Sequence, residues 1–183
     1  MRITQNLTRW SKLNLLALTL LPLATAGGLK LPLQGSFSVS AEASPNTTGS
    51  SFCGGSATDQ IAIEAHGTGF STLGAFTFTL HKTFNLNTGE YHGCLVLTAP
   101  SGDTLNANYK LIQSASTSDF ATGSGTLTIT GGTGLFKGAT GTLNITGVFL
   151  SLYPANSFLG GGKAPLPVAA NYTVDGAISL GGF

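Results

Sequence analysis

The chain has 183 residues, of which only 8% are charged, and this length fits one domain. Its basic residues gather at the start. After residue 26 the chain keeps five lysines and seven acidic residues, and it has no arginine. A chain without arginine and without a basic patch lacks the positive charge that nucleic-acid binding needs, so we exclude a nucleic-acid partner.

Residues 1–26 have the features of a secretory signal peptide. Arg2, Arg9 and Lys12 form a basic start, an apolar run covers residues 13–23, and residues 24–26 read Ala-Thr-Ala. A membrane anchor needs about 20 apolar residues, which is more than this run supplies. We therefore predict cleavage after residue 26 and one domain over residues 27–183. The mature protein would be secreted or periplasmic and would not be an integral membrane protein.

The mature chain has two cysteines, Cys53 and Cys94. In an exported protein an even cysteine count favours a disulfide, which here would stabilise the fold by about 4 kcal/mol. A pair of buried free thiols is the alternative. Two cysteines and three scattered histidines have no metal-ligand spacing, so we expect no metal site, and no motif indicates a cofactor.

Strand-like segments recur along the whole mature chain. Apolar and polar residues alternate in them, as in Phe-Thr-Phe-Thr-Leu-His over residues 76–81. The predicted strands cover residues 34–41, 60–68, 73–83, 91–98, 104–113, 125–130, 142–153 and 169–180. Polar, glycine-containing loops and turns separate them, and no segment has a convincing helical pattern.

Eight consecutive strands with short connections predict an all-β fold, an eight-stranded antiparallel up-and-down β-barrel. Closure removes the exposed sheet edges, and a two-sheet sandwich is the alternative. Such a barrel is either packed by its own side chains or holds one small ligand. An outer-membrane barrel is disfavoured because the alternating face from Asp175 to Gly181 is not apolar.

The most distinctive segment covers residues 129–145. Its glycines flank a single aromatic residue, Phe136, and strand-like alternation lies on both sides of them; they are Gly131, Gly132, Gly134, Gly138 and Gly141. Glycine adopts the positive φ values that sharp reversals need. The segment therefore predicts a strand, a double bend around an anchored Phe136, and a second strand.

Residues 129–141, Ile-Thr-Gly-Gly-Thr-Gly-Leu-Phe-Lys-Gly-Ala-Thr-Gly, resemble the glycine-rich signature of plant allene oxide cyclases and dirigent proteins. Small exported bacterial proteins carry similar segments. The resemblance implies a calycin-like barrel of eight antiparallel strands. Dirigent proteins usually have arginine in the second bend, where this chain has Thr140. Allene oxide cyclases use a buried acid on an early strand, for which Glu64 is the only candidate here.

Four residues are candidates for acid–base chemistry inside the barrel: Glu64, His66, His81 and His92. A carboxylate and imidazoles in an apolar lumen would have shifted pKa values and could transfer protons. The alternative is that they face solvent, opposite the aromatic and aliphatic face that forms the core.

Three functional hypotheses follow. The first is an exported barrel that binds a small hydrophobic molecule or has a structural role, and it requires an apolar cavity without converging polar groups. The second is a lumenal isomerase or cyclase, which requires Glu64 or a histidine inside the cavity. The third is a surface adhesion or ice-contact protein, suggested by the threonines of residues 77–79 and 126–128, and it requires a packed interior. The sequence leaves open whether the protein is an enzyme and whether it forms oligomers.

Overall fold

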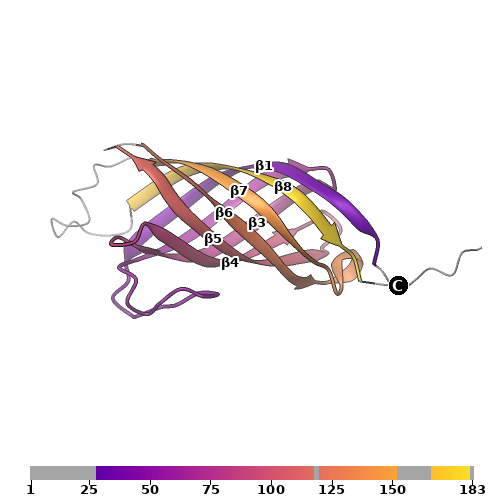
Figure 1. The fold of residues 1–183 in the computed structure, drawn as a ribbon, viewed down its shortest axis with the longest axis horizontal. Helices are drawn as coiled ribbons and strands as arrows, with labels where there is room; N and C mark the ends of the chain where they lie inside the picture. Colours follow the sequence, from indigo (N-terminus) through magenta and orange to yellow (C-terminus); the bar gives the residue numbers. More distant parts are fainter. Residues whose placement is uncertain (1–27, 118–119, 152–165, 182–183) are drawn as a thin grey trace, which may run out of the picture.

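The computed structural model of the protein describes residues 28–117, 120–151 and 166–181, so the predicted signal peptide lies outside the described residues (Figure 1). Eight strands form a single closed sheet in which each strand pairs antiparallel with its sequence neighbours, and β1 pairs with β8. The strands are β1 (Lys30–Pro45), β2 (Ile61–Ser71), β3 (Gly74–Asn85), β4 (Glu90–Thr98), β5 (Thr104–Ser116), β6 (Phe120–Gly132), β7 (Thr140–Ser151) and β8 (Leu166–Ser179). This topology confirms the up-and-down barrel and rules out the sandwich.

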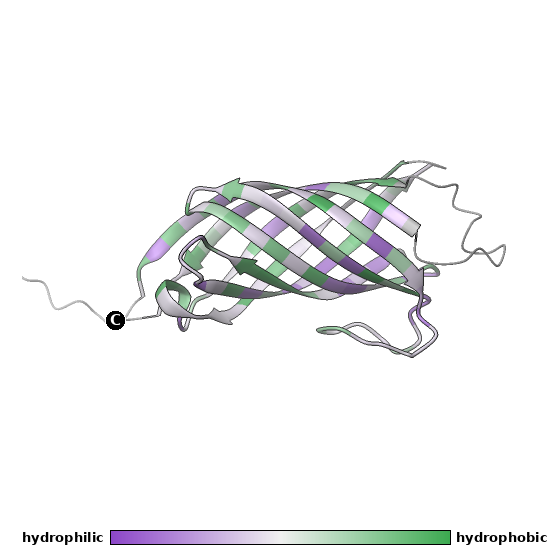
Figure 2. Cartoon of the chain, turned by 180° about the vertical axis from the view of Figure 1, so that it is seen from behind, coloured by the Kyte–Doolittle hydropathy of each residue, from purple (hydrophilic) through white to green (hydrophobic). Residues whose placement is uncertain are grey.

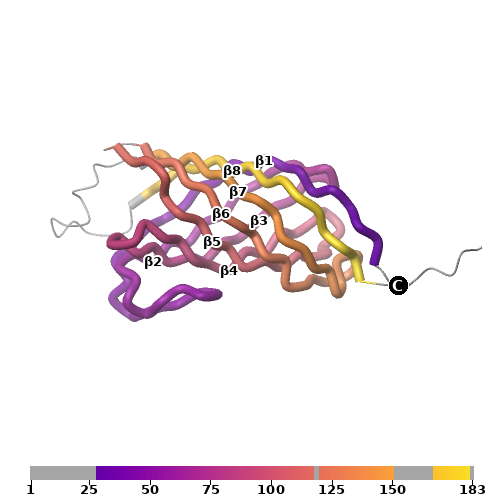
Figure 3. The backbone as a smooth tube through the Cα atoms, in the orientation of Figure 1, coloured from indigo at the N-terminus to yellow at the C-terminus, as the bar shows by residue number. Residues whose placement is uncertain are grey.

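The strands run obliquely around an elongated barrel (Figure 3). Successive side chains along a strand point alternately inward and outward, as the alternating burial along β3 shows. On β3 the inward Phe76, Phe78 and Leu80 are buried, whereas the threonines between them are exposed. The hydropathy colours change along each strand in the same way (Figure 2). The buried residues of all eight strands form one hydrophobic core inside the barrel.

Several strands are longer than the sequence predicts. β6 begins at Phe120, five residues before the predicted start, because inward glycines hide the alternation there. A Cβ atom on Gly123 would lie 2.2 Å from Cδ2 of Leu111, so the glycine leaves the room that the leucine fills. Similarly, β5 continues to Ser116 through most of a predicted polar loop. Glycine and serine therefore take part in this barrel wall although they are weak strand formers.

The glycine-rich segment connects β6 to β7 at one end of the barrel. A single 3₁₀ turn, η1 (Gly134–Phe136), lies between β6 and β7, and φ is positive at Gly134 (53°) and Gly138 (70°). Phe136 is only 6% exposed, and its ring centroid lies 5.9 Å from that of Phe76 on β3. The double bend therefore positions one aromatic side chain at the end of the core.

Residues 46–60 form a long loop beside β3 and β4 at the other end of the barrel (Figure 1). The predicted disulfide is present: Cys53 of the loop is bonded to Cys94 of β4, with Cα atoms 5.2 Å apart. Asp59 accepts hydrogen bonds from Thr83 and Asn85 on β3. Burial alone would raise the pKa of Asp59, but these hydrogen bonds and one from the Ser56 N–H outweigh it and hold the pKa low. The loop is thus attached to the outside of the wall at two places.

Candidate functional site

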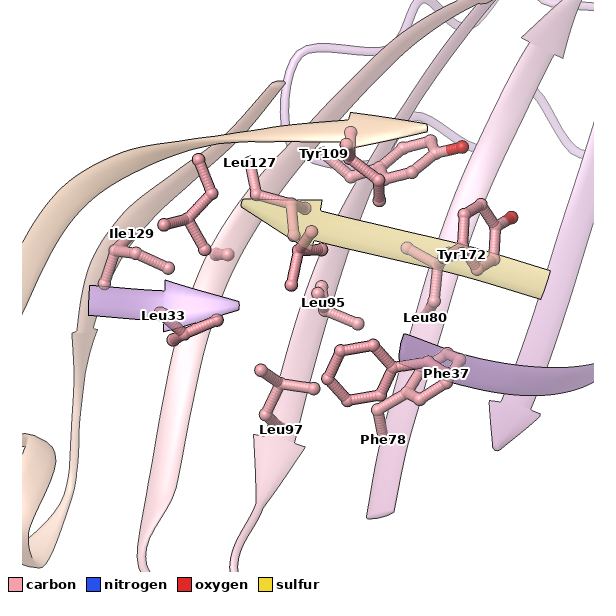
Figure 4. Close-up of a pocket in the computed structure, with 14 residues that line it drawn as sticks. Leu33, Phe37, Phe78, Leu80, Leu95, Leu97, Tyr109, Leu127, Ile129 and Tyr172 are labelled. Carbon is pink, nitrogen blue, oxygen red and sulfur yellow. The ribbon is translucent and has the colours of Figure 1, made fainter. Parts of the chain in front are cut away.

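The barrel interior contains an apolar cavity with about 20 Å³ open to the centres of water-sized molecules. Its wall consists almost entirely of aliphatic and aromatic carbon, contributed by side chains such as Leu33, Leu95, Ala107 and Leu127 (Figure 4). Holding one water requires about 10–15 Å³ and at least two polar partners. This cavity has the necessary volume, but its lining favours an apolar guest over water.

Tyr109 of β5 and Tyr172 of β8 limit one side of the cavity. Their rings belong to the cavity wall, and their hydroxyl groups point away from the leucines (Figure 4). The ring centroids lie 6.1 Å apart in an edge-to-face arrangement, a geometry that aromatic pairs favour. These two tyrosines therefore separate the apolar cavity from a polar region further along the barrel.

Lys82 occupies that polar region, and it is 3% exposed. It is the next inward residue of β3 after Leu80, which itself lines the cavity. The Lys82 amine donates a hydrogen bond of 2.9 Å to the Tyr172 hydroxyl oxygen. Four ring centroids lie 4.6–5.6 Å from the nitrogen, those of Tyr91, Tyr109, Phe149 and Tyr172. Aromatic faces at this range attract the charged form of the amine.

Burial nevertheless lowers the pKa of Lys82 to about 7. No carboxylate of the described residues lies within 4.0 Å of the amine, so no ion pair offsets the loss of hydration. Burial also raises the pKa values of Tyr91 and Tyr172, which therefore stay protonated at neutral pH. The interior thus holds an amine that is partly uncharged under ordinary conditions.

The Tyr109 hydroxyl is the one buried side-chain polar group of the described residues that has no hydrogen-bond partner. Burial raises the pKa of Tyr109, and the Tyr172 hydroxyl, which is close enough to interact with the Tyr109 hydroxyl, raises it further. The Tyr109 hydroxyl nevertheless makes no hydrogen bond of good geometry. An unsatisfied buried hydroxyl costs about 1–3 kcal/mol. Native proteins rarely retain such a group without a reason.

The four residues expected to line the interior lie outside it. The side chains of Glu64 and His81 are 69% and 45% exposed, and they face each other across β2 and β3 with Nδ1 and Oε1 3.7 Å apart. His66 is exposed on the same outer face. The inward positions of β2 belong to Ile61, Ile63 and Ala65, and a one-residue offset in a strand reverses the face. Solvent hydrates the carboxylate and imidazoles there, so the solvent-facing alternative holds for these candidates and none of the three lies in the lumen.

His92 also lies on the outer face, beside the disulfide-bonded loop. Its Nε2 atom is 3.6 Å from Glu90, whose carboxylate also lies 3.3 Å from the Lys110 amine. His92 and Lys110 thus share the Glu90 carboxylate on the outer face. In the part of the chain that the structure describes, no three His, Cys, Asp or Glu residues are grouped closely enough to hold a metal ion.

The threonines suggested for ice contact are spread around the wall. Thr77 on β3 lies between Thr68 and Thr98 of the adjacent strands, but residues 126–128 belong to β6, three strands further round the closed sheet. The two groups therefore face different directions. They do not form one flat surface.

Sequence reasoning missed Lys82 and its tyrosines, although a signal was present. The alternation of Phe76, Phe78 and Leu80 continues at Lys82, which places its side chain inside. The same alternation places Tyr91, Tyr109 and Tyr172 inward on their own strands. Which of these four residues meet could not be read from alternation, because it depends on the stagger of strands around the barrel.

Comparison with known proteins gives no relative from which to infer the activity: no family model, curated protein or solved structure matches the chain. Within the described ranges, no helix is long and apolar enough to cross a membrane. The chemistry of the site therefore has to be argued from its own residues.

Proposed function

We propose that this protein is an exported β-barrel that binds a small apolar molecule in its interior cavity. The observation that carries the proposal is the apolar wall of that cavity. A hydrocarbon can make van der Waals contacts with this wall, whereas a water molecule would lack the hydrogen-bond partners that it needs there. The disulfide supports export, because such bonds persist in oxidising compartments, and so does the signal peptide that the sequence predicts.

The cavity volume limits the ligand to a few carbon atoms. A fatty acid or a larger terpene would have to displace several core side chains from a tightly packed barrel. We also propose distant kinship with the allene oxide cyclase and dirigent barrels. The double bend around Phe136 and the eight-stranded topology support this kinship, and neither carries an activity with it.

Propane is a suitable probe because it has no polar group. With methyl groups labelled for NMR, titration with propane should shift the signals of Leu33, Leu95 and Leu127, which line the cavity, and should leave Val148 on the outer face unchanged. Ala107→Leu fills the cavity and should abolish the shifts. Asn108→Leu, the next and outward residue of β5, is the matched control and should retain them.

Equal shifts in wild type and Ala107→Leu would place propane elsewhere and overturn the proposal. Absence of shifts in wild type would favour a purely structural barrel. Because Ala107→Leu also risks overpacking, which costs about 1–3 kcal/mol, the smaller Ala107→Val provides a second test. It should weaken binding in a protein that remains folded.

A further inference from the structure

Among the polar groups of the described interior, two stand out that binding of a hydrocarbon does not use. One is the Lys82 amine, buried among aromatic rings, and the other is the hydroxyl of Tyr109, a residue that is 1% exposed and whose hydroxyl has no hydrogen bond of good geometry. Both lie behind the same part of the cavity wall, because the rings of Tyr109 and Tyr172 form that wall and also lie 5.3 and 5.6 Å from the amine. A ligand in the cavity therefore reaches the amine by displacing these rings.

These two groups are complementary to one kind of functional group. An uncharged amine has a lone pair on nitrogen and attacks electrophilic carbon, and desolvated lysines are accordingly the ones that form Schiff bases. A free hydroxyl donates a hydrogen bond to an oxygen atom. A carbonyl group presents the carbon and the oxygen together.

We propose that Lys82 forms a reversible imine with a small aldehyde whose hydrocarbon part occupies the apolar cavity. This inference rests on the proposed function, since it assigns the chemical class of the ligand that the cavity takes. The Tyr109 hydroxyl donates to the carbonyl oxygen, and the Tyr172 hydroxyl holds the amine in position through the hydrogen bond already present.

The reaction needs no oxidant, reductant or further reactant. The Lys82 nitrogen forms a bond to the carbonyl carbon while the carbonyl π electrons move to oxygen, giving a carbinolamine. The nitrogen loses two protons in all, and both leave with the oxygen as water when the C=N bond forms. Addition of water reverses the sequence and releases the aldehyde.

A neutral aldehyde fits the interior better than a carboxylate. A carboxylate would have to leave water for a cavity wall without polar groups, and isolated buried charges carry a large desolvation cost.

Propanal tests the inference, because borohydride reagents reduce an imine to a stable propyl-lysine that peptide mass spectrometry locates. In wild-type protein at pH 7, Lys82 should be propylated at least about tenfold faster than Lys110, whose side chain is 51% exposed. The expectation follows because each pKa unit changes the uncharged fraction about tenfold and the pKa of Lys82 is about 7. Lys110→Met should leave labelling of Lys82 unchanged.

Tyr109→Phe keeps the ring that lines the cavity and removes only the hydroxyl, and it should slow propylation of Lys82 about tenfold at saturating propanal. A loss of rate at saturation would not follow if Tyr109 only filled space. Lys82→Met should bind propane and form no imine in the interior. Labelling of Lys82 no faster than Lys110 in a wild-type protein that binds propane would overturn the aldehyde inference and leave the proposed function standing.

If wild type binds neither propane nor propanal, both proposals fail together. Propionate provides a third arm. Should propionate shift the cavity methyl signals while propanal does not label Lys82, the ligand is an anion and the imine is wrong.

Discussion

Lys82 is the residue whose environment departs furthest from its ordinary chemistry. Its amine keeps one hydrogen bond, to Tyr172, in a barrel whose described interior offers it no carboxylate. The folded pKa of about 7 lies well below the value of 10.5 for an unhindered lysine. Folding therefore releases a proton at mildly alkaline pH, and stability must depend on pH.

The sign of this dependence follows from proton counts. Between about pH 7 and pH 10 the unfolded state binds more protons at Lys82 than the folded state does, so the free energy of unfolding rises with pH. The limiting slope is about 1.4 kcal/mol per pH unit, and below pH 7 the contribution of Lys82 levels off because both states are protonated. The raised pKa values keep Tyr91, Tyr109 and Tyr172 protonated in the folded state. In the unfolded state tyrosine begins to lose its proton near about pH 9, which opposes the rise, so the slope due to Lys82 is clearest below about pH 8.5.

Denaturant unfolding between about pH 7.0 and pH 8.5 measures this slope. Wild type should become more stable across the range, and Lys82→Met should lose most of the increase. Lys110→Met is the control, since its partly exposed amine should leave the slope unchanged. A slope that is the same in wild type and Lys82→Met would show that the amine is not strongly desolvated.

At the scale of elements, the glycine-rich bend connects two turns at one end of the barrel. The Thr133 N–H donates to the Thr104 carbonyl oxygen at 2.8 Å, and the Thr104 N–H donates to the Thr133 hydroxyl at 2.9 Å. A Cβ atom on Gly134 would overlap the Asp103 carboxylate. The bend therefore requires glycine for space as well as for its positive φ.

Phe136 and Leu135 test what this bend contributes. Phe136→Ala removes a ring that is 6% exposed and should lower the free energy of unfolding by about 3–5 kcal/mol. Leu135→Ala, at a side chain that is 58% exposed, should change it by less than about 0.5 kcal/mol. Thermal and denaturant unfolding give both values. Similar losses in the two variants would mean that Phe136 does not anchor the end of the core.

The sequence predicts more of the fold than of the site. The strands follow from local alternation, whereas the site depends on which residues meet across the barrel. Alternation identifies strands and faces residue by residue, and it gave eight strands, the barrel and the anchored Phe136. The strand limits failed where glycine replaces apolar residues, as at Gly123 and Gly125. The site was harder to predict, because charged and polar residues were taken as the candidates for function. Of these, Glu64 and His81 lie on the outer, solvated face of the barrel.

The meeting of Lys82 with Tyr109 and Tyr172 depends on strand stagger. These residues belong to β3, β5 and β8, which are not neighbours in the sheet, so their contact crosses the barrel interior. No local pattern in the sequence shows that Lys82 and these tyrosines are close in space. Their proximity follows only from the tilt and stagger with which the eight strands close into a barrel.

At the scale of the whole molecule, the barrel is filled in layers along its axis. The inward residues of β3 show the order of these layers. At one end Phe76 packs on Phe136, and Phe78 packs on Phe37 in the next layer. Leu80 then lines the cavity, Lys82 contacts the tyrosines, and Phe84 stacks on Tyr91 toward the other end. Aromatic layers therefore lie toward both ends, and the small apolar space and the buried amine lie between them. This arrangement is suited to a small guest that enters an otherwise packed interior.

The most direct test of this account is a crystal structure of the wild-type protein under xenon pressure. Xenon is apolar and spherical, and its anomalous scattering identifies it without reference to chemistry. We expect a xenon peak among Leu33, Leu95 and Leu127 in wild type, and no such peak in Ala107→Leu. An interior without xenon, in a crystal that binds xenon at other sites, would contradict the claim that this barrel has room for an apolar ligand.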